Sequence, residues 1–135
     1  MSDVLFLKIQ RLKDETLYLK GNKDRFLATL RSSTDTRKIV ERSVFLAAEA
    51  VLDISDLILI NKGCPRPATY RDAIYKLGEY KIVPQEFAYR FTYIAGVRNF
   101  LAHDYLKETT PTLEDFLKEK LTDIESFIQF VEGCI

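Results

Sequence analysis

The sequence has few of the residue types that build metal sites and phosphate-binding loops. Its 135 residues include one histidine and two cysteines, Cys64 and Cys134, which lie far apart in the chain. A closed structural zinc site needs four Cys or His ligands, so this inventory excludes one. The five glycines are scattered, which excludes a glycine-rich loop that cradles phosphate. We therefore expect neither a metal nor a cofactor.

The chain also lacks a net charge, because 20 Lys and Arg balance 20 Asp and Glu. A neutral chain is not typical of proteins that coat nucleic acid by bulk electrostatics, although it can still bind a few phosphates in a small pocket. The charge is unevenly distributed: residues 1–45 have an excess of basic residues, and residues 46–135 an excess of acidic ones. Either solvated helix faces or separate basic and acidic sides of the protein explain this pattern.

Long uninterrupted apolar runs are missing as well. The longest apolar stretch, residues 43–60, contains Glu49, Asp53 and Asp56. Each would cost roughly 2.5–3.5 kcal/mol near the centre of a bilayer, so we expect no membrane association. The first ten residues show no targeting signal, and two thiols in a chain of this size are typical of a reducing compartment. We therefore expect a cytoplasmic protein.

Apolar residues recur at helical spacing along the chain, and proline and glycine mark the breaks between the segments. Thr69 and the run Ser32-Ser33-Thr34-Asp35 supply signals for helix starts. Helices are predicted over residues 3–20, 23–30, 35–60, 70–77, 84–102 and 111–131. The pattern contains no convincing strand. The sequence therefore predicts a single all-α domain over residues 1–135.

The predicted third helix is apolar around nearly its whole circumference between residues 44 and 60. A helix of this kind is buried on all sides. In a small bundle one face packs inward, and a second subunit in a two-fold dimer is an economical way to bury the other face. The alternative is that the short second and fourth segments of the same chain cover it.

Three charged residues interrupt this surface at a regular spacing. Arg42, Glu49 and Asp53 are seven and four residues apart, which places them on one stripe of the helix. Two interpretations are open at this point. The stripe is either a ladder of surface ion pairs or a polar lining that faces a cleft.

The single histidine, His103, lies at the end of a strongly apolar helix together with Arg98, Asn99 and Tyr105. Asn99 and His103 are four residues apart and are neighbours on a helix. Arg98 and His103 are five apart, which separates them by about 140° on an ideal helix. They converge on one substrate only if the helix ends or distorts between them, or if two copies face each other across a dimer axis. A lone histidine without such context is usually structural.

The string Arg-Asn-x-x-x-His-x-Tyr over residues 98–105 resembles the signature of HEPN-domain proteins of the HepT-like group. HEPN stands for higher eukaryote and prokaryote nucleotide-binding. The general pattern is an arginine, four to six residues and a histidine, and HepT-like members add a tyrosine two residues later. The resemblance extends to the length of the chain and its all-α content. It implies a HEPN-type antiparallel bundle of four main helices plus short ones, assembled as a homodimer.

This resemblance also implies a function. HepT-like proteins are toxins of toxin–antitoxin systems and act as metal-independent ribonucleases, with a site formed at the dimer interface. Arg98 and His103 are the implied catalytic pair for transphosphorylation of RNA, and Asn99 would orient the phosphate or the imidazole. An imidazole moves protons near neutral pH, and a guanidinium suits the charge on a pentacovalent phosphate. The residues expected to line the site are Arg42, Glu49, Asp53 and Asp104.

Tyr105 has a separate implied role. In HepT-like systems a nucleotidyltransferase antitoxin of the MNT type transfers AMP to this tyrosine, which adds a phosphate where the RNA phosphate must bind. The alternative is a packed aromatic residue that positions His103. For the protein as a whole, a non-catalytic HEPN module that binds nucleotide or pairs with a nucleotidyltransferase as a scaffold stays open, as does a structural dimerisation domain. The intact pair of Arg98 and His103 favours the nuclease.

Overall fold

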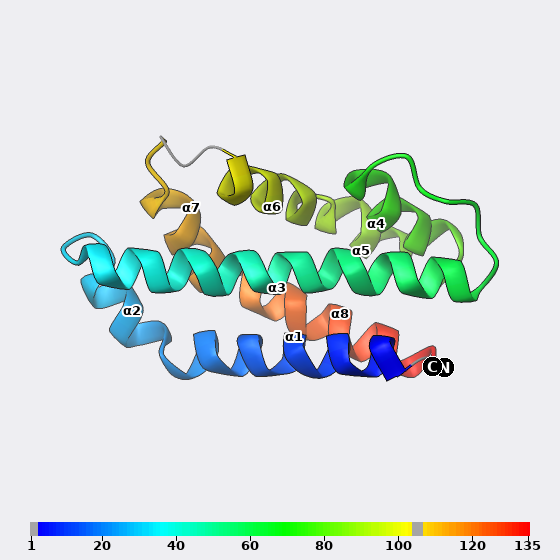
Figure 1. Cartoon of the computed structure of the whole chain (residues 1–135), viewed down its shortest axis with the longest axis horizontal. Helices are drawn as coiled ribbons and strands as arrows, with labels where there is room; N and C mark the ends of the chain where they lie inside the picture. The colour runs from blue at the N-terminus through cyan, green and yellow to red at the C-terminus, as the bar shows by residue number, and fades with distance from the viewer. Residues whose placement is uncertain (1–2, 104–106) are drawn as a thin grey trace.

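Every regular element of the computed structural model, which describes residues 3–103 and 107–135, is a helix (Figure 1). The predicted all-α class is thereby confirmed. In chain order the helices are α1 (Asp3–Gly21), α2 (Lys23–Thr29), α3 (Thr34–Asn61), α4 (Tyr70–Glu79), α5 (Gln85–Phe91), α6 (Tyr93–His103), α7 (Thr110–Asp115), the π-helix η1 (Phe116–Lys120) and α8 (Leu121–Gly133).

Two helices begin at the capping residues that the sequence indicates. The Ser33 side chain accepts a hydrogen bond from the Thr36 backbone N–H at 3.1 Å, which starts α3. Thr69 accepts one in the same way from the backbone N–H of Asp72 at 3.0 Å, which starts α4. Each hydroxyl satisfies a backbone donor that has no partner inside its helix.

The segment predicted as one helix over residues 84–102 is two helices, α5 and α6, with a break at Thr92. The Thr92 hydroxyl donates to the Tyr89 carbonyl at 2.9 Å, and its backbone stays near helical values, with φ −58° and ψ −19°. The apolar periodicity therefore continues across the break and conceals it. The predicted last helix is likewise divided into α7, η1 and α8.

The helices form an antiparallel bundle around α3 (Figure 1). Along the chain, α1 and α3 run in opposite directions, α4 to α6 return along α3, and α7 to α8 reverse the direction again. The α3 helix packs against α1, α4 and α6. The largest fully buried side chains include Phe26, Leu52, Phe91 and Phe127, so one apolar core joins these helices.

The all-round burial of α3 is achieved within one chain. Val44, Leu52 and Ile54 are fully buried, although they lie on different sides of the helix. The covering elements are chiefly α1, α4 and α6, so α2 and α4 alone do not account for it. The apolar circumference of α3 therefore does not by itself require a second subunit, and the homodimer stays a prediction. Among the described residues, none of the helices combines the length and apolar character needed to span a bilayer.

Candidate active site

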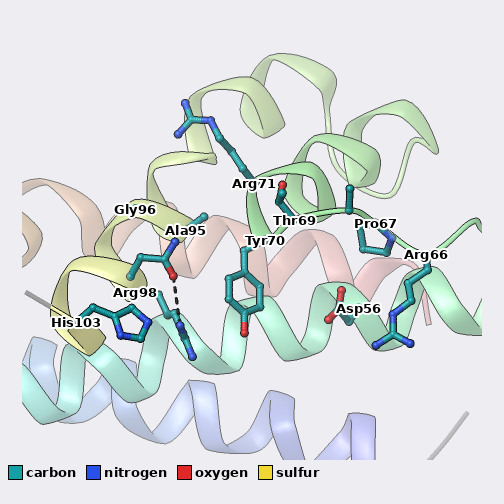
Figure 2. A pocket seen from close by; sticks show the side chains of 12 residues that line it. Asp56, Arg66, Pro67, Thr69, Tyr70, Arg71, Ala95, Gly96, Arg98 and His103 are labelled. Carbon is teal, nitrogen blue, oxygen red and sulfur yellow. Dashed lines mark hydrogen bonds between the residues drawn. The ribbon is translucent and has the colours of Figure 1, made fainter.

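A pocket of about 660 Å³ lies where α6 and the segment entering α4 meet α3, and we call it the α4–α6 pocket (Figure 2). Its volume is in the range of sites that hold drug-sized ligands. One wall is the motif helix α6 and the opposite wall is the segment 66–71. The lining residues are Asp56, Arg66, Pro67, Ala68, Thr69, Tyr70, Arg71, Ala95, Gly96, Arg98, Asn99 and His103.

Arg98 and His103 both line this pocket and lie at the same end of it (Figure 2). Both residues belong to α6, and the helix is continuous from Arg98 to His103. His103 is exposed, whereas the Arg98 side chain is only 17% exposed. Because the helix neither ends nor breaks between them, their meeting on one substrate across a dimer axis stays a prediction.

The Arg98 guanidinium is held on several sides by described residues. Its Nε donates to Glu49 Oε1 at 3.2 Å, and its Nη1 donates to Asn99 Oδ1 at 3.2 Å. The guanidinium carbon lies 4.9 Å from the centre of the Tyr70 ring and 5.7 Å from that of Phe45. Among the described residues, Nη2 donates to no acceptor. A preoriented guanidinium with free N–H donors is suited to bind a phosphate oxygen.

The three charged residues of the α3 stripe have different surroundings. Glu49 contacts the motif arginine, in agreement with its expected place in the site. Asp53 instead forms an ion pair with Lys8 of α1 at 2.9 Å. Arg42 lines a separate depression of about 420 Å³ beside the end of α6 and is not among the residues of the α4–α6 pocket. Neither Arg42 nor Asp53 is thus among the residues of the α4–α6 pocket, and their place in the site stays a prediction.

Two predicted site residues, Asp104 and Tyr105, lie outside the residues that the structure describes. Asn99 lines the pocket, as expected, and its carbonyl oxygen contacts Arg98. Within residues 3–103 and 107–135, no group of three or more His, Cys, Asp or Glu side chains is placed to hold a metal ion.

Sequence reasoning missed the second wall of the pocket. Arg66, Tyr70 and Arg71 precede the motif by more than two dozen residues, and nothing in the local sequence links them to it. Asp56 is the one carboxylate of the lining. Burial and the nearby Asp53 raise the pKa of Asp56, and Arg66 lowers it. The pocket therefore has more cationic than anionic side chains, although the chain as a whole is neutral.

The antiparallel helical bundle and the pocket lined by both Arg98 and His103 agree with the HEPN class that the motif indicates. The chain belongs to the HepT-like family: the model described as "Ribonuclease HepT-like" matches residues 9–131. The resemblance read from the motif is thereby confirmed.

A curated relative has a similar sequence over part of its length. The tRNA nuclease HepT of Aphanizomenon flos-aquae (strain 2012/KM1/D3) is 35% identical over 74 residues, which are 55% of this chain and 50% of that protein. The match thus spans about half the length of the curated relative.

Two solved structures show the same fold over almost the whole chain. A MntA–HpeT toxin–antitoxin structure, in a mutant with a tyrosine replaced by alanine, has a TM-score of 0.85, 20% identity, and coverage of 97% of this chain and 99% of the other. A tri-AMPylated Shewanella oneidensis HEPN toxin in complex with MNT antitoxin has a TM-score of 0.82 and 20% identity, with coverage of 98% and 99%. At this identity the likeness shows the fold, which is that of HEPN toxins.

Proposed function

We propose that this protein is the toxin of a toxin–antitoxin system and a metal-independent ribonuclease. The observation that carries the proposal is that Arg98 and His103 line one pocket, with the guanidinium already oriented by Glu49 and Asn99. Membership of the HepT-like family supports a ribonuclease. The curated relative is a tRNA nuclease, which supports RNA as the substrate class.

In the proposed reaction the 2′-oxygen of a ribose attacks the adjacent phosphorus and the bond from phosphorus to the 5′-oxygen breaks. The products are a 2′,3′-cyclic phosphate and a 5′-hydroxyl. His103 accepts the proton of the 2′-hydroxyl or donates one to the leaving 5′-oxygen. Arg98 donates hydrogen bonds to the non-bridging oxygens, whose negative charge increases in the pentacovalent transition state.

A homodimer would bring a second proton-transfer group to the reaction. The chain has one histidine, and one imidazole cannot act as the base and the acid of the same step. Two copies that place their motif pockets against each other supply both groups. This arrangement requires the pocket to lie on the surface that the two copies share.

The exposed side of α1 and α3 supports such a shared surface. Val4, Leu7 and Tyr18 of α1 are 53%, 64% and 42% exposed, and Ile39 of α3 is 45% exposed. Ile39 begins a row of positions spaced by three or four residues that continues along α3 to Glu49, the partner of the motif arginine. Exposed apolar groups next to a polar site are typical of a protein interface.

The second part of the proposal concerns neutralisation of the toxin. We propose that a nucleotidyltransferase antitoxin of the MNT type transfers AMP to Tyr105. The phenol oxygen attacks the α-phosphorus of ATP and pyrophosphate leaves. The Shewanella toxin of the same fold is AMPylated and bound to an MNT antitoxin, which supports this partner. Coexpression with the antitoxin should add the mass of one adenylate per modified site, and the addition should be absent in Tyr105→Phe.

The catalytic assignment is tested with Arg98→Ala and His103→Ala, expressed in cells and assayed on RNA in EDTA. Both variants should fail to arrest growth. Their rate of RNA cleavage should fall at least about a hundredfold, which is the contribution that one acid–base or oxyanion-stabilising group typically makes. Lys118→Ala is the control, because this exposed lysine lies outside the pocket. If growth arrest and cleavage persist in both variants, the assignment as an Arg98–His103 nuclease is wrong. The alternative, a non-catalytic module that binds nucleotide or acts as a scaffold, would then be favoured.

A further inference from the structure

We propose that Arg66 forms a second phosphate-binding subsite of the α4–α6 pocket, which holds a phosphate of the RNA strand next to the scissile one. The inference rests on the proposed ribonuclease function. In this proposal the segment 66–71 binds the RNA strand, whereas Arg98 and His103 catalyse its cleavage.

The first argument is the availability of the Arg66 guanidinium group. Arg66 is exposed and forms no hydrogen bond or ion pair with a described residue, whereas the Arg71 guanidinium points away from the pocket (Figure 2). Elsewhere in the chain, Arg31 donates to Glu114 at 2.6 Å, and Arg90 forms a hydrogen-bonded ion pair with an aspartate of α8. An unpaired arginine retains all its donors for a phosphate, and its fork matches the geometry of phosphate oxygens.

The second argument is the size and length of the pocket. A volume of about 660 Å³ exceeds what one phosphate group fills and is in the range for a nucleotide-sized ligand. Figure 2 shows His103 and Arg98 at one end, Arg66 at the other end, and the Tyr70 ring between them. A strand whose scissile phosphate lies at the motif end therefore has a neighbouring nucleotide within the same pocket.

The third argument is that the segment is held in place before any ligand binds. The backbone N–H of Ala68 donates to Asp72 at 3.0 Å, and the backbone N–H of Asp72 donates to Thr69 at the same distance. These reciprocal bonds fix the chain at the start of α4. Because the backbone next to Arg66 is ordered in advance, binding loses less conformational entropy.

Tyr70 links the two ends of the pocket. Its half-buried ring lies under the Arg98 guanidinium at 4.9 Å, and it is flanked in sequence by Arg71. Asp56, at the same end as Arg66 (Figure 2), opposes an anion there and partly offsets the arginine charge. The subsite should therefore bind phosphate more strongly when this carboxylate is neutralised.

The binding experiment uses a short fluorescent single strand of 2′-O-methyl RNA, which lacks the attacking hydroxyl, and measures Kd by anisotropy at several salt concentrations. Arg66→Gln should raise Kd about tenfold and reduce the slope of log Kd against log salt by about 0.7, the value for one phosphate contact in a single strand. Asp56→Asn should lower Kd. Lys118→Gln, with the same loss of charge outside the pocket, should match the wild type.

A kinetic experiment on cleavable RNA distinguishes an effect on RNA binding from an effect on the catalytic step. Arg66→Gln should raise KM about tenfold with kcat within about twofold of the wild type, and the pH profile should not move. Unchanged Kd and salt slope in this variant, or a loss of kcat with KM unchanged, would overturn the subsite. If the wild type binds the strand as described but cleaves no RNA, the proposed function fails and the subsite stands. If the wild type cleaves and Arg66→Gln matches it in Kd and KM, the subsite alone fails.

Discussion

Arg98 of α6 donates from Nε to Oε1 of Glu49 on α3 at 3.2 Å, and this ion pair joins the motif to the central helix of the bundle. The two side chains are 17% and 29% exposed. Because Glu49 accepts from Nε, it fixes the plane of the guanidinium and leaves Nη2 for a substrate oxygen. Glu49 is therefore a positioning residue for the proposed chemistry.

Replacing Glu49 should slow the cleavage step without preventing RNA binding. Glu49→Ala should lower kcat about tenfold, equivalent to about 1.4 kcal/mol of transition-state stabilisation, because the guanidinium loses its fixed orientation. Glu49→Gln keeps an acceptor for Nε and should restore part of this loss. Single-turnover cleavage of RNA measures both effects.

Asp53→Asn is the matched control for this prediction. It removes the same charge from the same helix, but its partner is Lys8 of α1 and the motif is untouched. Wild-type kcat in Glu49→Ala, or an equal loss in Asp53→Asn, would contradict the positioning role.

The Tyr70 ring should matter more than its hydroxyl group. The ring lies 4.9 Å from the Arg98 guanidinium, and a cation–π contact contributes about 0.5–1 kcal/mol at an exposed site. Tyr70→Phe keeps the ring and should cleave RNA at close to the wild-type rate. Tyr70→Leu should lose about two- to fivefold in kcat/KM. An equal loss in the two variants would show that the phenol, and not the ring, is the important group.

Asp56 should reduce stability at neutral pH. Burial raises its pKa, Asp53 raises it further and Arg66 lowers it, so the folded protein binds this proton more tightly than the unfolded chain does. The native state is therefore favoured below the ordinary aspartate pKa of about 3.9, and this advantage is lost as the pH rises through the raised pKa. Asp56→Asn cannot ionise, so it should raise the free energy of unfolding at pH 7.

Urea unfolding between pH 7 and about pH 4 measures this effect. The difference between Asp56→Asn and the wild type should shrink as the pH falls toward the ordinary aspartate value. Glu119→Gln, at an exposed carboxylate outside the pocket, should show no such trend. A difference that grows on acidification would contradict the sign of the shift.

Gly78 allows α4 to pack closely on α5. A Cβ added there would lie 2.7 Å from the Cβ of Ala88 and 3.2 Å from the Cα of Gln85. Gly78→Ala should therefore destabilise the fold by about 1–3 kcal/mol through overpacking. Ala88→Gly removes the clashing carbon, so the double variant should lose less than the sum of the two single losses. Strict additivity in thermal or urea unfolding would argue against this contact.

Much of the fold and part of the site were predictable from local signals. The caps at Ser33 and Thr69 follow from side-chain chemistry within a few residues. The break at Thr92 was not predictable, because its backbone stays near helical angles and the apolar periodicity continues. The π-helix η1 was not predictable for the same reason, since its buried residues Phe116 and Leu117 fit the apolar periodicity of an α-helix.

The charge of the pocket was not predictable, because it depends on long-range packing. Arg66 resembles a residue of a solvated loop in the sequence, and only the packing of α4 beside α6 places it across the pocket from the motif. The surroundings of the α3 stripe were not predictable for a related reason. Spacing places Arg42 and Asp53 on one side of the helix, but the identity of the neighbouring helix decides which site each one joins.

The most direct test of the central claim is the chemistry of the RNA ends. Purified wild-type protein in EDTA should cleave RNA to 2′,3′-cyclic phosphate and 5′-hydroxyl ends, which end-labelling and mass spectrometry identify. A single 2′-deoxy substitution at the cleaved nucleotide should abolish that cut, and His103→Ala should produce none. Cleavage of the deoxy-substituted strand at the same position, or 5′-phosphate ends, would contradict transphosphorylation by Arg98 and His103.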